Sequence, residues 1–168
     1  MTPLPENAPQ TLGAAFAHIY TVGKPTLTDL KVMVLVEAAG LTLYEETAKA
    51  TDNPQVQALL RHNGREEMAH AHRVSKAIRA FSGEDFPPPD AADNPYLVGP
   101  IPSTPVTAAG LKKTAEAEFG GDALYARWAA ATENVEAAAL FRQNGKEETD
   151  HGNRLLEAAA LLEQWSND

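Results

Sequence analysis

The sequence predicts an all-α protein, a four-helix bundle made of two similar helical hairpins joined by one long connection. Three observations support this fold class. Four long segments carry apolar residues at the spacing of an amphipathic helix. A proline-rich segment separates the second of them from the third. The segments on its two sides also match each other residue by residue, which indicates a duplicated unit.

The first 25 residues contain four prolines and are predicted to form an arm, with a short helix within Leu12 to Tyr20 that docks on the main body. We expect the rest of the chain, 26–168, to be the bundle. Its predicted parts are a first repeat at about 26–81, a linker at 82–106 and a second repeat at about 107–165.

Capping residues and helix breakers place the four helices. Thr26 or Thr28 can cap a first helix that runs to about Thr51, and Asn53 with Pro54 can begin a second that runs to about Phe81. The linker that follows holds seven prolines, so it is expected to be stiff and extended. The third helix is predicted from Thr107 to Thr132 and the fourth from Asn134 to Gln164.

The internal repeat has an offset of 81 residues. Positions 37–78 align with 118–159 without a gap, and 18 of the 42 pairs are identical. Chance similarity between helices would favour alanine and leucine, whereas here many of the matching residues are polar, among them Glu, His, Asn, Arg and Tyr. We interpret the two hairpins as a duplicated unit related by a pseudo-two-fold axis.

Composition excludes several classes of function. The net charge of −9 and the lack of any cluster of Lys and Arg disfavour nucleic acid binding. No apolar run approaches the length of a membrane span. Cysteine is absent, which rules out disulfides and cysteine-bound iron sites. The first residues lack the pattern of a signal peptide, so we expect a cytoplasmic protein.

The candidate site begins with two Glu-x-x-His pairs, Glu67 with His70 and Glu148 with His151. A spacing of three puts both side chains of a pair on one helical face. Glu37 lies about 21 Å before the first predicted turn and Glu67 about 20 Å after it, so an antiparallel hairpin brings them to the same level. The repeat places Glu118 equivalently in the second hairpin.

Four carboxylates and two imidazoles would then converge inside one bundle. Isolated charges in a helix core cost too much free energy, so these groups must share protons, pair with cations or bind metal. Two metal ions bridged by the glutamates would balance the charge. Carboxylate and imidazole ligands without sulfur suit iron or manganese, and zinc is also possible.

This ligand set resembles the ferritin-like di-iron carboxylate superfamily, in which two helices give one Glu each and two give Glu-x-x-His. The resemblance covers about 26–165. It implies that Glu37, Glu67, His70, Glu118, Glu148 and His151 bind two iron ions, without settling which glutamates bridge.

Within the superfamily the near-symmetric halves are rubrerythrin-like, and the spacing from Glu37 to Glu67 is similar to encapsulated ferritins. The chain differs from rubrerythrins in having no rubredoxin module and in Gly121, which stands where rubrerythrins usually place a further carboxylate. These differences disfavour rubrerythrin-type peroxide reduction.

The resemblance implies a di-iron oxidoreductase, ferroxidase-like or peroxidase-like, that oxidises Fe(II) or reacts with O2 or peroxide. Alternatives are a non-catalytic metal-binding or scaffold bundle, and a di-metal oxidase of an organic substrate. A homo-oligomer, a dimer or larger, is expected.

Several neighbouring residues have two interpretations each. Tyr44 and Tyr125 lie on the face of Glu37 and Glu118 and are either redox-active or core residues, with packing slightly favoured. Asn63 and Asn144 either orient a ligand or are structural. Glu66 and Glu147 are interpreted as solvent-facing, with an accessory iron position as the alternative, and Trp128 and Trp165 as packing residues.

Overall fold

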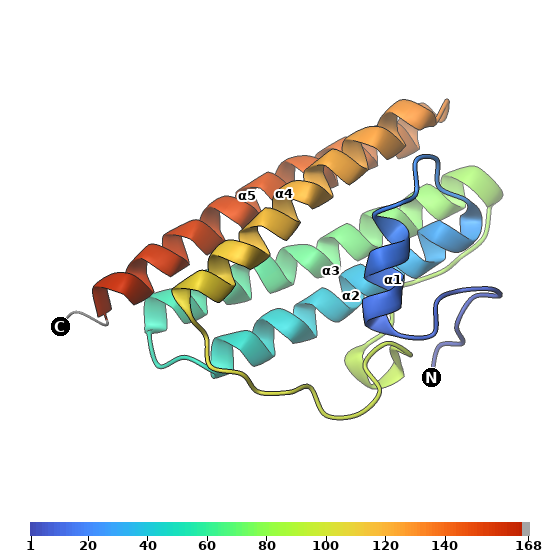
Figure 1. The fold of residues 1–168 in the computed structure, drawn as a ribbon. Helices are drawn as coiled ribbons and strands as arrows, with labels where there is room; N and C mark the ends of the chain where they lie inside the picture. The colour runs from blue at the N-terminus through green and yellow to red at the C-terminus, as the bar shows by residue number, and fades with distance from the viewer. Residues whose placement is uncertain (166–168) are drawn as a thin grey trace.

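The computed structural model describes residues 1–165, and this part of the chain contains α-helices, one short 3-10 helix and no β-strand (Figure 1). The all-α prediction is therefore confirmed. Residues 166–168, the end of the predicted bundle, lie outside the described part. The elements are α1 (Leu12–Ile19), α2 (Leu27–Lys49), α3 (Pro54–Ser82), η1 (Ala91–Asp93), α4 (Ala108–Ala131) and α5 (Val135–Trp165).

Local sequence signals set the helix ends. Thr26 caps α2 through a capping box with Asp29, and the side chain of Asn53 accepts hydrogen bonds from the first backbone amides of α3. Gly83 adopts a φ of 74° and ends α3 in the left-handed conformation that glycine tolerates best. Thr107, near which the third helix is expected to begin, caps α4 through its side chain.

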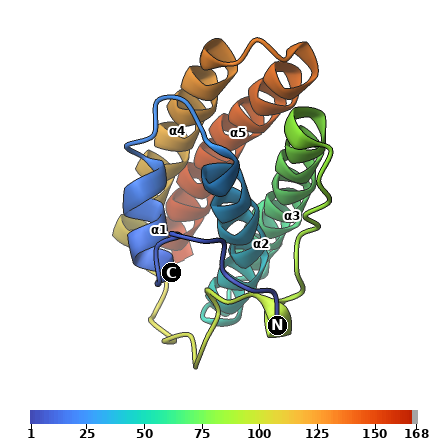
Figure 2. The same cartoon turned by 90° about the vertical axis from the view of Figure 1, so that its right-hand side faces the viewer.

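The bundle is closed on three sides and open on the fourth. α2 packs against α3, α4 packs against α5, and α3 packs against α5 (Figure 2). Within the described residues, no Cα atom of α2 comes within 8 Å of one in α4. The short helix α1 lies over this open side, where the Tyr20 hydroxyl donates a hydrogen bond of 2.9 Å to the carbonyl of Ala117 in α4.

The apolar core consists of two clusters separated by a polar layer. One lies toward the α1 end of the bundle and includes Ile19, Leu30, Ile78, Trp128 and Phe141. The other lies toward the opposite end and includes Ala48, Val56, Leu60, Leu111 and Leu155. Along each long helix, the candidate site residues fall between the positions that contribute to these two clusters.

The connection from α3 to α4 contains no α-helix and runs back along the bundle (Figure 1). Asn94 fixes it to α2 by donating a 2.8 Å hydrogen bond to the carbonyl of Leu35. The crossover lets α4 begin at the end of the bundle where α3 also begins, so α2 and α4 carry equivalent residues at equivalent levels. No helix in the described part is both long and apolar enough to cross a bilayer.

The two tryptophans have different environments. Trp128 is fully buried, contacts Tyr125 and Phe141 edge to face, and donates a 3.0 Å hydrogen bond to the carbonyl of Val22. Trp165 is 60% exposed, so its interpretation as a packing residue is wrong. It belongs to the last turn of α5, and no other helix of the described residues buries it.

We expect Trp128→Ala to lower the free energy of unfolding by about 3 to 5 kcal/mol, because it removes a large buried side chain and leaves a cavity. The matched change Trp165→Ala should alter stability by no more than about 0.5 kcal/mol. Urea denaturation followed by circular dichroism measures both. Equal effects of the two substitutions would contradict this account of the core.

Candidate metal centre

The structure brings the six predicted ligands together in the polar layer. α2 contributes Glu37, α3 contributes Glu67 and His70, α4 contributes Glu118, and α5 contributes Glu148 and His151. Both histidines are fully buried, and the side chain of Glu118, the most accessible of the carboxylates, is 14% exposed. The site therefore lies inside the bundle.

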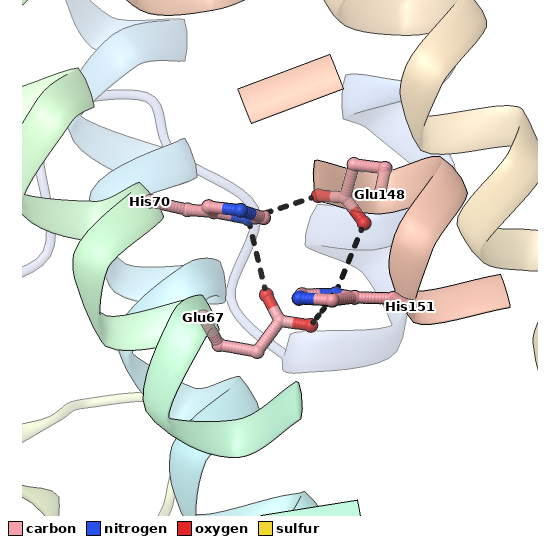
Figure 3. Close-up of side chains that lie close together, drawn as sticks. All are labelled: Glu67, His70, Glu148 and His151. Atoms are coloured by element: carbon pink, nitrogen blue, oxygen red, sulfur yellow. Dashed lines mark ion pairs between the residues drawn. The ribbon is translucent and has the colours of Figure 1, made fainter. Parts of the chain in front are cut away.

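Four residues form its centre (Figure 3). Glu67, His70, Glu148 and His151 offer ligand atoms that all lie within 4.8 Å of one another. Glu67 approaches Nδ1 of His70 at 3.7 Å with one oxygen and Nδ1 of His151 at 3.3 Å with the other. Glu148 likewise approaches Nδ1 of His70 at 3.2 Å with one oxygen and Nδ1 of His151 at 3.6 Å with the other. The imidazole rings are stacked, with centroids 5.0 Å apart.

Glu37 and Glu118 flank this centre, one at each histidine. Glu37 lies 3.7 Å from Nδ1 of His70, and Glu118 lies 3.8 Å from Nδ1 of His151. Each also accepts a hydrogen bond from a tyrosine of the other hairpin, Glu37 from Tyr125 and Glu118 from Tyr44. The tyrosines therefore do more than pack, because they fix the orientation of the outer carboxylates.

Glu66 and Glu147 are not simply solvent-facing, which corrects the sequence-based interpretation. Glu147 lies 3.1 Å from Nε2 of His70, and Glu66 lies 3.1 Å from Nε2 of His151. Each carboxylate binds a histidine of the opposite hairpin, because the faces of α3 and α5 that carry them pack together. The identity of Glu66 and Glu147 in the repeat was a signal that could have indicated this role.

Two arginines and two asparagines complete this outer network. Arg73 donates to Glu147 at 2.6 Å, and Arg154 donates to Glu66. Asn144 accepts from Arg73 and donates to the carbonyl of His70. Likewise, Asn63 accepts a hydrogen bond from Arg154 and donates one to the carbonyl of His151. These contacts favour a supporting role for the asparagines around the histidines.

The histidine geometry fits metal ligation. With Nε2 facing a carboxylate, each ring is expected to carry a hydrogen on Nε2, which leaves the Nδ1 lone pair for a ligand. Both Nδ1 atoms are buried, face the carboxylates, and have no hydrogen-bond partner among the described residues. A buried polar atom without a partner is rare and costly, and a metal ion beside each Nδ1 atom would provide the missing partner.

Without metal, protons would balance the charge. Burial alone would lower the pKa of His151, but the carboxylates of Glu118, Glu148 and Glu67 that surround its Nδ1 atom raise it to about 12. The pKa of His70 is also raised far above its ordinary value, by Glu147, Glu148 and Glu37. Burial and the nearby charges of Glu148 and Glu37 raise the pKa of Glu67. Metal binding must therefore displace protons.

Two equivalent glycines make room for the central carboxylates. A Cβ atom at Gly40 would lie 2.8 Å from Cγ of Glu67, and one at Gly121 would lie 3.2 Å from Cδ of Glu148. A larger residue at either position would push the adjacent glutamate out of place. Gly121 thus adds no carboxylate of its own, and its missing side chain leaves room for Glu148.

A family model for rubrerythrin matches residues 30–159, which include all of these ligands. The chain belongs to the rubrerythrin family. Together with the buried Glu and His cluster, this membership fits a di-metal carboxylate site.

Similarity to individual proteins is more limited for this rubrerythrin family member. Over 78 residues it is 42% identical to the aerobic magnesium-protoporphyrin IX monomethyl ester [oxidative] cyclase of Rubrivivax gelatinosus. The match covers 46% of this chain and 22% of the cyclase, so the chain matches only about a fifth of that protein. No solved structure matches significantly.

We expect the double variant Glu66→Gln, Glu147→Gln to bind divalent metal about tenfold to a hundredfold more weakly, because neutral amides hold the imidazoles less firmly. Competition between the protein and a chelator for Co(II) or Zn(II) measures this. The control is Glu157→Gln, an exposed glutamate on α5. Unchanged affinity in the double variant would show that these carboxylates do not support the ligands.

Proposed function

We propose that the chain binds two iron ions through Glu37, Glu67, His70, Glu118, Glu148 and His151, and that it oxidises Fe(II) or reacts with O2 or peroxide. The observation that carries this proposal is the pair of buried Nδ1 atoms that face the carboxylates without hydrogen-bond partners. Carboxylate and imidazole donors suit iron, and they also accept manganese or zinc.

The distances support different roles for the two pairs of glutamates. Glu67 and Glu148 each direct one oxygen toward each histidine, as expected of residues shared by two ions. Glu37 approaches only His70, and Glu118 approaches only His151, as expected of ligands to a single ion. The tyrosine hydrogen bonds hold these outer carboxylates in place.

When bound, a pair of iron ions supplies one electron each to an oxidant. The residues of the chain would hold the two ions close together. The apolar clusters on both sides limit the access of water, and the Glu66 and Glu147 network fixes the histidines. Because the six ligands come from all four long helices, the fold itself maintains their spacing.

Oxidation of an organic substrate is a second candidate. The observation that favours it is the similarity to the cyclase, a protein whose name states an oxidative reaction of an organic ester. A non-catalytic metal-binding bundle is the third candidate. In that case metal removal would lower thermal stability, and the bound metal would give no oxidation of Fe(II) above that of buffer.

We predict that two Fe(II) per chain, added anaerobically and then exposed to O2, will give Fe(III) charge-transfer absorption much faster than Fe(II) in buffer. Glu67→Ala combined with Glu148→Ala should abolish the difference, because both shared ligands are lost. This variant should still fold, since it removes buried charge. Stopped-flow absorption measures the rates, and circular dichroism checks helix content.

The matched control is Glu116→Ala combined with Glu157→Ala, which removes two exposed glutamates from α4 and α5. This control should react like the wild type. If the Glu67 and Glu148 double variant oxidises Fe(II) as fast as the control, the proposed function is wrong.

A further inference from the structure

A pocket of about 220 Å³ reaches the carboxylates from the open side of the bundle, between α1, α2 and α4. Its inner end is formed by Glu37, Glu67, Glu118 and Glu148. The histidines are not part of its wall and lie beyond these carboxylates, on the α3 and α5 side. The pocket therefore connects the surface with one face of the candidate metal centre.

Its walls are mainly apolar. The apolar side chains of the wall include Phe16, Ile19, Met33, Val36, Leu43 and Leu124. Three features keep this space open. The Cα atoms of α2 and α4 stay more than 8 Å apart, glycines occupy positions 40 and 121 beside the carboxylates, and α1 lines one side of the opening.

Tyr20, the residue directly after α1, attaches this part of the chain to α4. The ring of Tyr20 lies against Gly120, where an added Cβ atom would be 3.2 Å from the ring, and its hydroxyl binds the carbonyl of Ala117. Phe16 is 38% exposed and Tyr20 is 40% exposed, so aromatic surface borders the opening. Solvent contact of such surface is unfavourable, and an apolar ligand would reduce it.

The polar groups in the wall are already engaged. The hydroxyls of Tyr44 and Tyr125 donate to Glu118 and Glu37, and that of Tyr20 donates to Ala117. The two threonine hydroxyls of the wall, Thr47 and Thr114, donate to backbone carbonyls of their own helices. No lysine, arginine or histidine lines the pocket among the described residues, and its inner end is acidic. An anion would be repelled, and a strongly polar molecule would lose its hydrogen bonds to water with little replacement.

We propose that this pocket binds a small, uncharged, apolar organic molecule and holds it against the carboxylate face of the metal centre. Apolar cavities of about 150 Å³ are known to bind benzene, so the space suits a molecule of one or two rings. The second half of this statement rests on the proposed function, whereas binding in the pocket does not.

Toluene is a suitable probe, and the methionines report its position. We would label the full chain with [13C]methyl methionine and follow Met1, Met33 and Met68 by NMR during titration with toluene. Met33 lines the pocket, while Met1 and Met68 do not. The proposal predicts a saturable shift of the Met33 methyl signal at one toluene per chain, with Met1 and Met68 unaffected.

A filling substitution tests the location. Ala117→Phe places a ring at the pocket wall and should weaken toluene binding by at least about tenfold, since the ring occupies the same space. Ala123→Phe makes the same exchange at an exposed position of α4 outside the wall, and it should bind like the wild type. An unresponsive Met33, unsaturable shifts of all three signals, or equal binding by both variants would overturn the proposal.

A second measurement tests whether the bound molecule lies next to the metal ions. In protein loaded with Mn(II), bound toluene should show strongly enhanced proton relaxation compared with protein loaded with Zn(II), and Ala117→Phe should abolish the enhancement. Saturable binding without enhancement in Mn(II)-loaded protein would overturn the placement against the metals. A chain that binds toluene but takes up neither ion would contradict the proposed function and leave the pocket as a binding site.

Discussion

The burial of four carboxylates and two imidazoles in one layer of the bundle is the constraint on which the rest of the structure depends. Apolar clusters lie on both sides of this layer, so solvent provides little screening of its charges. Arg73 and Arg154 lie at its edge, and they pair with Glu147 and Glu66 and not with the central carboxylates. The centre must therefore acquire positive charge as protons or as metal ions.

The two hairpins meet this constraint by completing each other. Glu147 from α5 fixes His70 on α3, and Glu66 from α3 fixes His151 on α5. The tyrosine contacts also cross between hairpins, from α2 to Glu118 on α4 and from α4 to Glu37 on α2. One hairpin alone would lack the groups that orient its own ligands. In the duplicated structure, each hairpin thus orients the candidate ligands of the other.

The helices, and the convergence of the six candidate ligands in one layer, could be predicted from the sequence, because caps, proline and helical spacing act locally. Glu66 and Glu147 could not be placed in the same way. On their helices they point about 100° away from the ligands Glu67 and Glu148. Only because α3 packs on α5 does this side of each helix face a histidine of the other hairpin. Trp165 shows the opposite case, since its helical position gives no information on whether another helix covers it.

The pocket could not be predicted from the sequence. Periodicity indicates which residues of α2 and α4 face inward, but the distance between these helices depends on what fills the space between them. Gly40 and Gly121 are equivalent positions of the repeat, but the sequence does not show why they are glycine. The reason is that Glu67 lies against Gly40 and Glu148 lies against Gly121. The separation of α2 and α4 leaves room for the pocket that reaches these buried carboxylates.

Anomalous diffraction from crystals of the full chain loaded with Mn(II) would test the central claim most directly. The account predicts two peaks in the polar layer, one bound by Nδ1 of His70 with Glu37 and one by Nδ1 of His151 with Glu118. Glu67 and Glu148 should contact both ions. A layer without any peak, or histidines that bind the ions through Nε2 after releasing Glu66 and Glu147, would contradict it.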